Sequence, residues 1–182
     1  GSGSTAGDFS TRGSYYAAGP TVANLDGTGW SIIGTSWDST AVYVFDKDGH
    51  VRPGWPLVLN DGIWGCAAAG DLDNDGTQEL AFGSLNNRFY VMRANGSEWI
   101  DGDANVTTKG VFKLLNRPYN FGTPAIADID GNGVRDIVYG SYDGNMYAVR
   151  VTDGKLLWKT QTRREFAFGG SLRAYRSTLA VL

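Results

Sequence analysis

"GDLDNDGTQEL", residues 70–80, places four carboxylates in a run of only eleven residues. Carboxylates this close together repel one another, and some of them become protonated unless a cation lies between them. Asp, Asn and Gly are also the residues that ordinary β-turns favour, so a solvated acidic turn is the alternative interpretation. The sequence around the run favours the cation site, because the same run recurs in matching surroundings.

The acidic run belongs to a unit that occurs three times in the chain. The copies read "GPTVANLDGTGWSIIGTSWDSTAVYVFDKDG" (residues 19–49), "GCAAAGDLDNDGTQELAFGSLNNRFYVMRANG" (65–96) and "GTPAIADIDGNGVRDIVYGSYDGNMYAVRVTDG" (122–154). Their acidic loops are 47 (73 − 26) and 57 (130 − 73) residues apart. Each copy predicts short strands with apolar residues at a period of two. Four such strands in a repeat of this length are typical of β-propeller blades and not of a helical solenoid.

The repeat is similar to a known family. The stretch "PAIADIDGNGVRDIVYG" (residues 124–140), preceded by Phe121-Gly122, resembles the FG-GAP repeat, also called the VCBS or integrin-α-like repeat. The likeness extends from Gly19 to about Trp158. It implies an all-β fold with four antiparallel strands in each blade. It also implies that the acidic loop joins the first and second strands of a blade and holds calcium (Ca2+).

The spacing within the second loop fits such a role. Four carboxylates occupy its positions 1, 3, 5 and 9: Asp71, Asp73, Asp75 and Glu79. Alternating oxygen donors can converge on one hard cation, as in the first half of an EF-hand loop. Gly76 at position 6 permits the sharp turn, and Thr77 at position 7 offers its backbone carbonyl oxygen. We therefore expect a calcium ion in this loop.

The other two loops differ in their number of carboxylates. The third loop offers the side chains of Asp128, Asp130, Asn132 and Asp136, together with Gly133 for the turn and the backbone carbonyl of Val134. The first loop offers Asn24, Asp26 and Thr28, with Ile32 at position 9. We expect calcium in the third loop. With one carboxylate, the first loop is not expected to hold calcium at ordinary concentrations, although the sequence leaves open whether it binds any metal.

Charge and composition argue against several classes of function. The net charge of −3 and the isoelectric point of about 5.0 predict no basic surface for nucleic acid or anionic membranes, and no apolar run is long enough to span a bilayer. The single histidine, His50, falls in a predicted surface turn. The single cysteine, Cys66, lies among small residues and has no evident base partner. No catalytic residue is predicted, and a non-enzymatic role is favoured.

Tryptophan gives the remaining hint of a ligand. Trp30 and Trp37 lie in turn-rich stretches, where an exposed ring can stack on a sugar, whereas Trp55 and Trp99 are expected to pack between strands. The sequence thus predicts a calcium-stabilised binding or scaffold module that recognises carbohydrate or a protein surface. The alternative is the propeller part of a calcium-dependent polysaccharide lyase or a similar carbohydrate-active enzyme. That alternative would need a lysine or arginine beside a calcium ion.

The repeat boundaries predict an incomplete ring. Residues 1–16 are expected to be a tag remnant with an N-terminal strand. Residues 17–182 form the propeller segment, with blades at about 17–60, 63–115 and 120–162 and a partial fourth at 166–182. Propellers need about four to eight blades, so we expect either a homo-oligomer, most simply a dimer, or a part of a longer chain. The calcium loops favour a secreted or cell-surface location, where calcium is millimolar.

Overall fold

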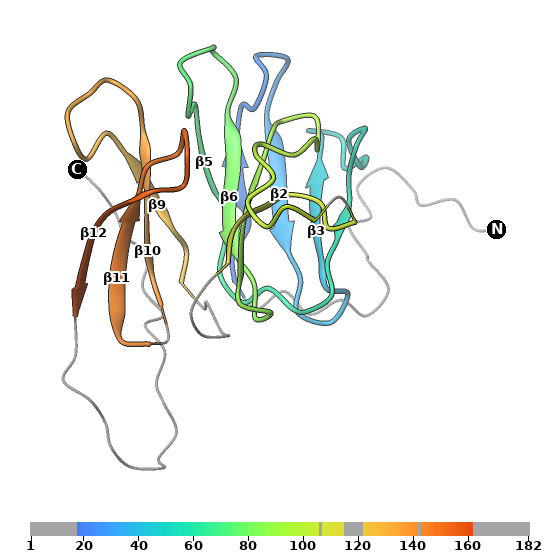
Figure 1. The fold of residues 1–182 in the computed structure, drawn as a ribbon. Coiled ribbons are helices and arrows are strands. Elements are labelled where there is room, and N and C mark those ends of the chain that lie inside the picture. The colour runs from blue at the N-terminus through green and yellow to red at the C-terminus, as the bar shows by residue number, and fades with distance from the viewer. Residues whose placement is uncertain (1–17, 106, 115–121, 142, 162–182) are drawn as a thin grey trace.

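The computed structural model describes residues 18–105, 107–114, 122–141 and 143–161. These residues form three four-stranded sheets and no helix (Figure 1). Blade 1 comprises β1 (Thr21–Ala23), β2 (Ser31–Thr35), β3 (Ala41–Phe45) and β4 (Leu57–Val58). Blade 2 comprises β5 (Ala68–Gly70), β6 (Glu79–Gly83), β7 (Arg88–Met92) and β8 (Val111–Leu114). Blade 3 comprises β9 (Ala125–Ala127), β10 (Asp136–Gly140), β11 (Asn145–Val149) and β12 (Leu156–Gln161).

Each blade is an antiparallel meander whose strands are paired in chain order. The alternating apolar segments supply the strands, and Gly-rich turns such as Asp48-Gly49 supply the connections. The prediction of an all-β fold with four-stranded blades is confirmed. The predicted N-terminal strand and the partial fourth blade lie outside the described residues. Because no described residue belongs to a helix, none of them forms a helix that could span a membrane.

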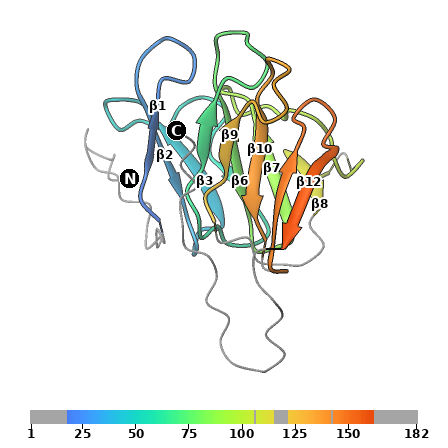
Figure 2. The ribbon, with the colours of Figure 1, turned by 90° about the vertical axis from the view of Figure 1, so that its left-hand side faces the viewer.

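The blades pack face to face, as Figures 1 and 2 show. Between blades 1 and 2, the buried side chains of Val42 and Val44 belong to the same apolar cluster as Phe82. Between blades 2 and 3, the rings of Phe89 and Tyr139 stack with their centroids 4.8 Å apart. Burial of large aromatic and β-branched side chains is the main favourable contribution to this packing.

Two tryptophans join neighbouring blades in the same way. The indole N–H of Trp55 donates to the carbonyl oxygen of Ala94 in the next blade, and that of Trp99 donates to the carbonyl oxygen of Val151, each at 3.1 Å. The structure therefore places both rings between blades, in agreement with the packing role predicted for them. A buried indole usually finds such a partner, because an unpaired N–H would be costly.

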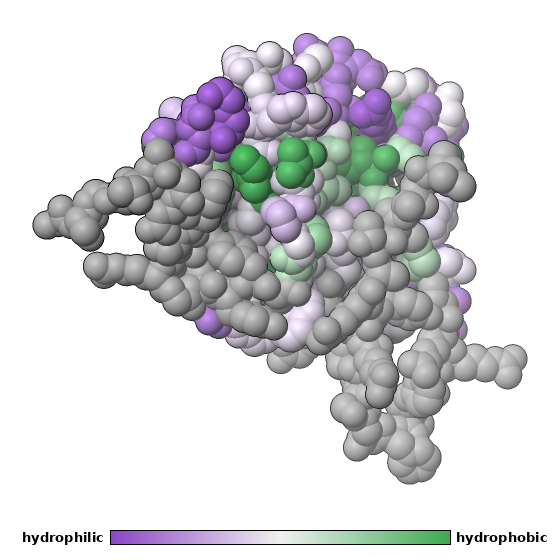
Figure 3. All heavy atoms as spheres, turned by 180° about the vertical axis from the view of Figure 1, so that it is seen from behind, coloured by the Kyte–Doolittle hydropathy of each residue, from purple (hydrophilic) through white to green (hydrophobic). Residues whose placement is uncertain are grey.

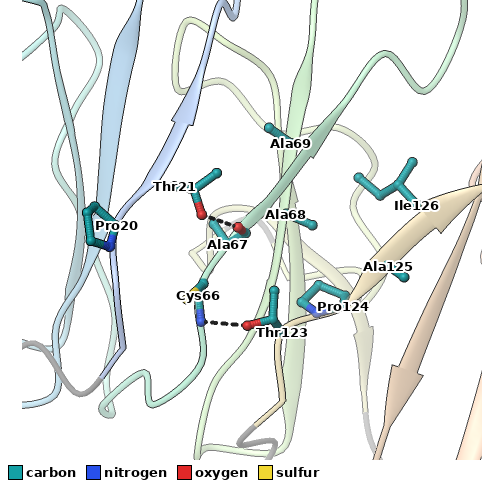
Figure 4. A pocket seen from close by; sticks show the side chains of 10 residues that line it. All are labelled: Pro20, Thr21, Cys66, Ala67, Ala68, Ala69, Thr123, Pro124, Ala125 and Ile126. Carbon is teal, nitrogen blue, oxygen red and sulfur yellow. Dashed lines mark hydrogen bonds between the residues drawn. The ribbon is translucent and has the colours of Figure 1, made fainter. Parts of the chain in front are cut away.

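The innermost strands β1, β5 and β9 line a shallow pocket of about 410 Å³ (Figure 4). The Thr21 hydroxyl donates to the Ala67 carbonyl oxygen at 2.6 Å, and the Cys66 amide donates to the Thr123 hydroxyl at 3.1 Å. The half-buried Cys66 thiol donates to the Gly19 carbonyl oxygen at 3.1 Å. Hydrogen bonds thus link the blades along their inner strands, and Cys66 takes part in those links.

The three acidic loops, which join β1 to β2, β5 to β6 and β9 to β10, lie along one edge of the molecule, at the top of Figures 1 and 2. Figure 3 shows hydrophilic residues gathered along this edge and a hydrophobic patch below it. The meander explains the common placement, since the first turn of every blade emerges at the same end. We call this edge the loop edge.

Candidate metal centres on the loop edge

The second loop brings three of its four predicted carboxylates together. One oxygen from each of Asp71, Asp73 and Glu79 lies within 4.8 Å of the others. Asp75 is outside this group, and its Oδ1 accepts hydrogen bonds from the amide and the hydroxyl of Thr77 at 2.7 and 2.6 Å. The Thr77 hydroxyl lowers the pKa of Asp75. This loop therefore presents a compact anionic cluster, with Asp75 held at its side.

The third loop repeats this arrangement. One oxygen from each of Asp128, Asp130 and Asp136 lies within 4.8 Å of the others. Asn132 occupies the place of Asp75, and its side-chain oxygen accepts the amide N–H of Val134 at 2.7 Å. In both loops the residue at position 7 thus donates its amide to position 5. Coordination by the carbonyl oxygens of Thr77 and Val134 stays a prediction.

The backbone path through the first six positions is similar in all three loops. The residues at position 4 have positive φ, namely Gly27 (77°), Asn74 (61°) and Gly131 (74°). Those at position 6 also have positive φ, namely Gly29 (139°), Gly76 (88°) and Gly133 (84°). This left-handed backbone explains the glycines, which adopt it without steric cost. The side-chain oxygens at position 1 accept the amide N–H at position 6 in every loop, at 2.9–3.3 Å.

The last carboxylate of each acidic cluster is fully buried. Glu79 accepts the Leu72 amide through Oε2 at 3.0 Å, and Asp136 accepts the Ile129 amide through Oδ2 at 3.1 Å. The second oxygen of each, Glu79 Oε1 and Asp136 Oδ1, is buried without a hydrogen-bond partner. An unsatisfied buried oxygen costs about 1–3 kcal/mol, and more where it is charged. Two such oxygens at matching places in two loops fit a bound cation.

The raised pKa values of the two buried carboxyls also fit a bound cation. Burial raises the pKa of Glu79 to about 7, and the charges of Asp73 and Asp75 act in the same direction. Burial also raises the pKa of Asp136, with a further contribution from Asp130. A cation would favour the charged form of both carboxyls, because it would supply opposite charge within the cluster. Arg93 already lowers the pKa of Glu79, but burial and the neighbouring aspartates outweigh it.

The first loop differs from its predicted alignment. Strand pairing sets Ala23 opposite Ser31, just as Gly70 stands opposite Glu79 and Ala127 opposite Asp136. The loop between the paired residues spans 24–30 in blade 1 but 71–78 and 128–135 in blades 2 and 3, so it is one residue shorter. Ser31, and not Ile32, stands where the other blades carry the last carboxylate. A count of nine positions from Asn24 leads to Ile32, because it does not allow for this one-residue deletion.

The two tryptophans proposed for ligand binding lie at opposite ends of β2. Trp30 directly precedes the strand on the loop edge and is 63% exposed. Trp37 follows the other end and packs edge-on against Trp64, with ring centroids 4.8 Å apart. A strand of this length separates its ends by roughly 17 Å, so the two rings do not line one site.

Arg93 is a neighbour of the second loop that the sequence did not predict. Its guanidinium lies 3.7 Å from Asp73 Oδ2 and 4.4 Å from the centre of the Trp99 ring. Arg93 follows β7 and lies twenty positions (93 − 73) beyond Asp73. Only the antiparallel pairing of β6 with β7 brings the two together, so no local spacing signals this contact.

Comparison with known proteins agrees with this architecture. Residues 71–139 match the model of the FG-GAP-like repeat. The fold is that of β-propeller blades, and the match at residues 71–139 agrees with the FG-GAP repeat that the sequence resembles. No curated protein matches the chain.

Several solved structures share the fold. The chain is similar to the computationally designed Ika8 protein, with a TM-score of 0.51 and 14% identity over 81% of this chain and 36% of that one. BamB from Moraxella catarrhalis gives a TM-score of 0.52 and 16% identity, over 80% of this chain and 37% of that one. The V. cholerae biofilm matrix protein Bap1 gives a TM-score of 0.53 and 21% identity, over 79% of this chain and 20% of that one. The chain thus spans little more than a third of the first two structures and a fifth of the third.

Proposed function

We propose that the chain is part of a calcium-stabilised β-propeller that acts as a non-catalytic binding or scaffold module outside the cytosol. The observation that carries the calcium assignment is the pair of buried oxygens without partners, Glu79 Oε1 and Asp136 Oδ1. Each belongs to a cluster of three carboxylates, and hard oxygen donors of this kind suit calcium. Loops of this type fill at the millimolar calcium concentrations found outside cells, which supports an extracellular location.

In this proposal calcium bridges the ends of the first two strands of blades 2 and 3. Its charge offsets the repulsion among Asp71, Asp73 and Glu79, and among the equivalent residues of the third loop. The loops then present a fixed edge to a partner, which is the usual way in which rigid scaffolds carry recognition loops. The partner proposed is a carbohydrate or a protein surface.

Calorimetry and thermal unfolding test the calcium assignment. Titration of the EDTA-treated chain should show two bound calcium ions per chain. The second loop should bind more tightly, because Asp75 beside its cluster adds a fourth negative charge where the third loop has the neutral Asn132. At a calcium concentration of 100 times the Kd, one site stabilises the folded state by about 2.7 kcal/mol. For a domain of this size that corresponds to roughly 5–10 °C in Tm. No heat of binding and an unchanged Tm would refute the assignment.

Trp30 is the proposed contact for a carbohydrate, because it is exposed and borders the loop edge. A glycan array probed with and without calcium tests this role, with Trp30→Ala as the variant. Trp158→Ala is a matched control, since Trp158 is a partly exposed tryptophan on β12. Loss of binding in both variants, or in neither, would contradict a role for Trp30.

Arg93 bears on the alternative of a polysaccharide lyase. It is the kind of basic residue beside an acidic loop that this alternative requires. However, a guanidinium keeps its proton at any physiological pH, so Arg93 suits charge neutralisation and not proton abstraction. An assay for lyase turnover on acidic polysaccharides, repeated with Arg93→Lys, distinguishes a polysaccharide lyase from a binding module. Turnover by the unaltered chain would favour the enzyme over the binding module.

A further inference from the structure

Arg52, between β3 and β4, inserts its side chain into the first acidic loop. One guanidinium nitrogen donates to Asp26 Oδ2 and lies 3.4 Å from the Thr28 hydroxyl, and the other donates to the Ser31 hydroxyl. The Arg52 side chain is only 17% exposed and that of Asp26 only 28%. Its backbone is fixed as well, since the Arg52 amide donates to the Val44 carbonyl oxygen at 2.8 Å.

The three side chains that Arg52 contacts are the structural counterparts of predicted metal ligands in the other two loops. Asp26 and Thr28 hold positions 3 and 5 of the loop, and Ser31 holds the place that Glu79 takes in blade 2 and Asp136 in blade 3. Ser31 is fully buried, as those two carboxylates are. Its hydroxyl has a partner in Arg52, whereas the corresponding carboxylates each leave one oxygen without one.

The charges match this difference. The first loop contains one carboxylate, Asp26, and the single positive charge of Arg52 balances it. The second and third loops contain four and three carboxylates, which one guanidinium would leave largely uncompensated. Hydrogen bonds to Thr28 and to Arg52 hold the pKa of Asp26 below its ordinary value, so Asp26 stays charged at neutral pH.

We propose that Arg52 is the built-in cation of the first loop and takes the place that calcium has in the other two. The acidic loop of blade 1 therefore stays closed without metal, whereas the acidic loops of blades 2 and 3 need bound calcium to stay closed. The contrast with blades 2 and 3 rests on the calcium function proposed above, but the role of Arg52 in blade 1 does not.

Arg93 shows that a nearby arginine is not sufficient for this role. Its guanidinium reaches one carboxylate of the second loop, at 3.7 Å, and its side chain is 40% exposed. It lies over the Trp99 ring, and Glu79 Oε1 still has no partner. A cation that closes a loop has to contact several ligand positions at once, as Arg52 does.

Hydrogen exchange followed by mass spectrometry tests the proposal on the unaltered chain. Peptides covering residues 24–31 should exchange at the same rate in calcium and in EDTA. Peptides covering 71–79 and 128–136 should exchange faster in EDTA. If residues 24–31 gain as much protection from calcium as the other loops, Arg52 does not replace the metal and the proposal is wrong.

The variant Arg52→Met tests the arginine directly. Because hydrogen bonds to charged groups are the stronger ones, exchange of residues 24–31 should rise roughly tenfold or more, equally in calcium and in EDTA. Arg150→Met is the matched control, since Arg150 also follows the third strand of a blade and pairs with an aspartate, Asp153. It should leave residues 24–31 unchanged. Unchanged exchange in Arg52→Met would overturn the proposal.

Two further comparisons keep the outcomes distinct. If Arg52→Met does not fold, Arg52→Lys retains the charge but cannot contact all three partners, and it should give a smaller rise in exchange of the first loop. Exchange equal to that of the unaltered chain would count against the proposal. If residues 71–79 and 128–136 ignore calcium, the calcium function fails, while the Arg52 variants still decide the role of Arg52.

Discussion

The side-chain nitrogen of Asn74, in the second acidic loop, donates a 2.8 Å hydrogen bond to the carbonyl oxygen of Gly133 in the third. Both residues have positive φ and lie at the turns of their loops. A backbone hydrogen bond joins the first two loops, where the main-chain N–H of Gln78 donates to the Leu25 carbonyl oxygen at 2.7 Å. The acidic loops of successive blades are therefore directly connected.

The Asn74 link predicts that the second and third loops are coupled. Asn74→Gly removes the hydrogen bond and keeps the left-handed backbone that glycine tolerates. Calcium should then bind the third loop about 2- to 5-fold more weakly, because an exposed hydrogen bond contributes toward the low end of 0.5–1.5 kcal/mol. Calorimetric titration measures this change. Asn87→Gly is the control, since Asn87 also has positive φ but lies in the β6–β7 turn, away from the loops.

The buried carboxylates predict a selective loss of calcium dependence. Glu79→Gln should abolish most of the calcium-induced rise in Tm that comes from the second loop, and Asp136→Asn that from the third. An amide keeps the shape of the side chain but loses the negative charge that the ion requires. Thermal unfolding with calcium and with EDTA gives the comparison. Asp48→Asn, in an exposed turn, should keep the full response; an equal loss there would point to a general charge effect.

The calcium-free chain should lose stability as the pH rises. The folded-state pKa of Glu79, about 7, lies above the ordinary value of 4.5 because the carboxyl is buried. The folded state therefore holds this proton more tightly than the unfolded state does, and stability falls as the pH rises from about 4.5 through 7. In EDTA, Tm should be higher at pH 5.5 than at pH 8. Calcium should reverse this trend, and Glu79→Gln should flatten it. A Tm that does not change with pH in the calcium-free, unaltered chain would contradict the raised pKa of Glu79.

The outer face of blade 1 predicts association. Val22 is 56% and Val58 67% exposed, and pairing places both on the same face of the sheet as Ile32 and Phe45. In blade 2 the equivalent face, with Leu80 and Met92, packs against blade 1. We expect the chain to dimerise through such a terminal face at micromolar concentration. Light scattering tests this: Val58→Glu should shift the mass toward the monomer, and a monomeric unaltered chain would refute it.

Local sequence determined the repeat, the strand order and the acidic loops. A blade is a meander of neighbouring segments, so alternating apolar residues and glycine turns are enough to predict it. The first two carboxylates of a loop, such as Asp71 and Asp73, are close in the chain, and the glycine at position 6 permits the turn that follows them. The grouping of these carboxylates could therefore be predicted without knowledge of the other blades.

Tertiary structure alone decided the features that depend on pairing between distant segments. The register of β1 with β2 put Ser31, and not Ile32, at the end of the first loop. In the folded chain Glu79 is fully buried and one of its side-chain oxygens has no hydrogen-bond partner. Arg52 reaches Asp26 across 26 (52 − 26) positions, because the antiparallel return of β3 along β2 brings it back to the loop edge. Contacts of this range follow from how strands and blades meet, which no local pattern of residues specifies.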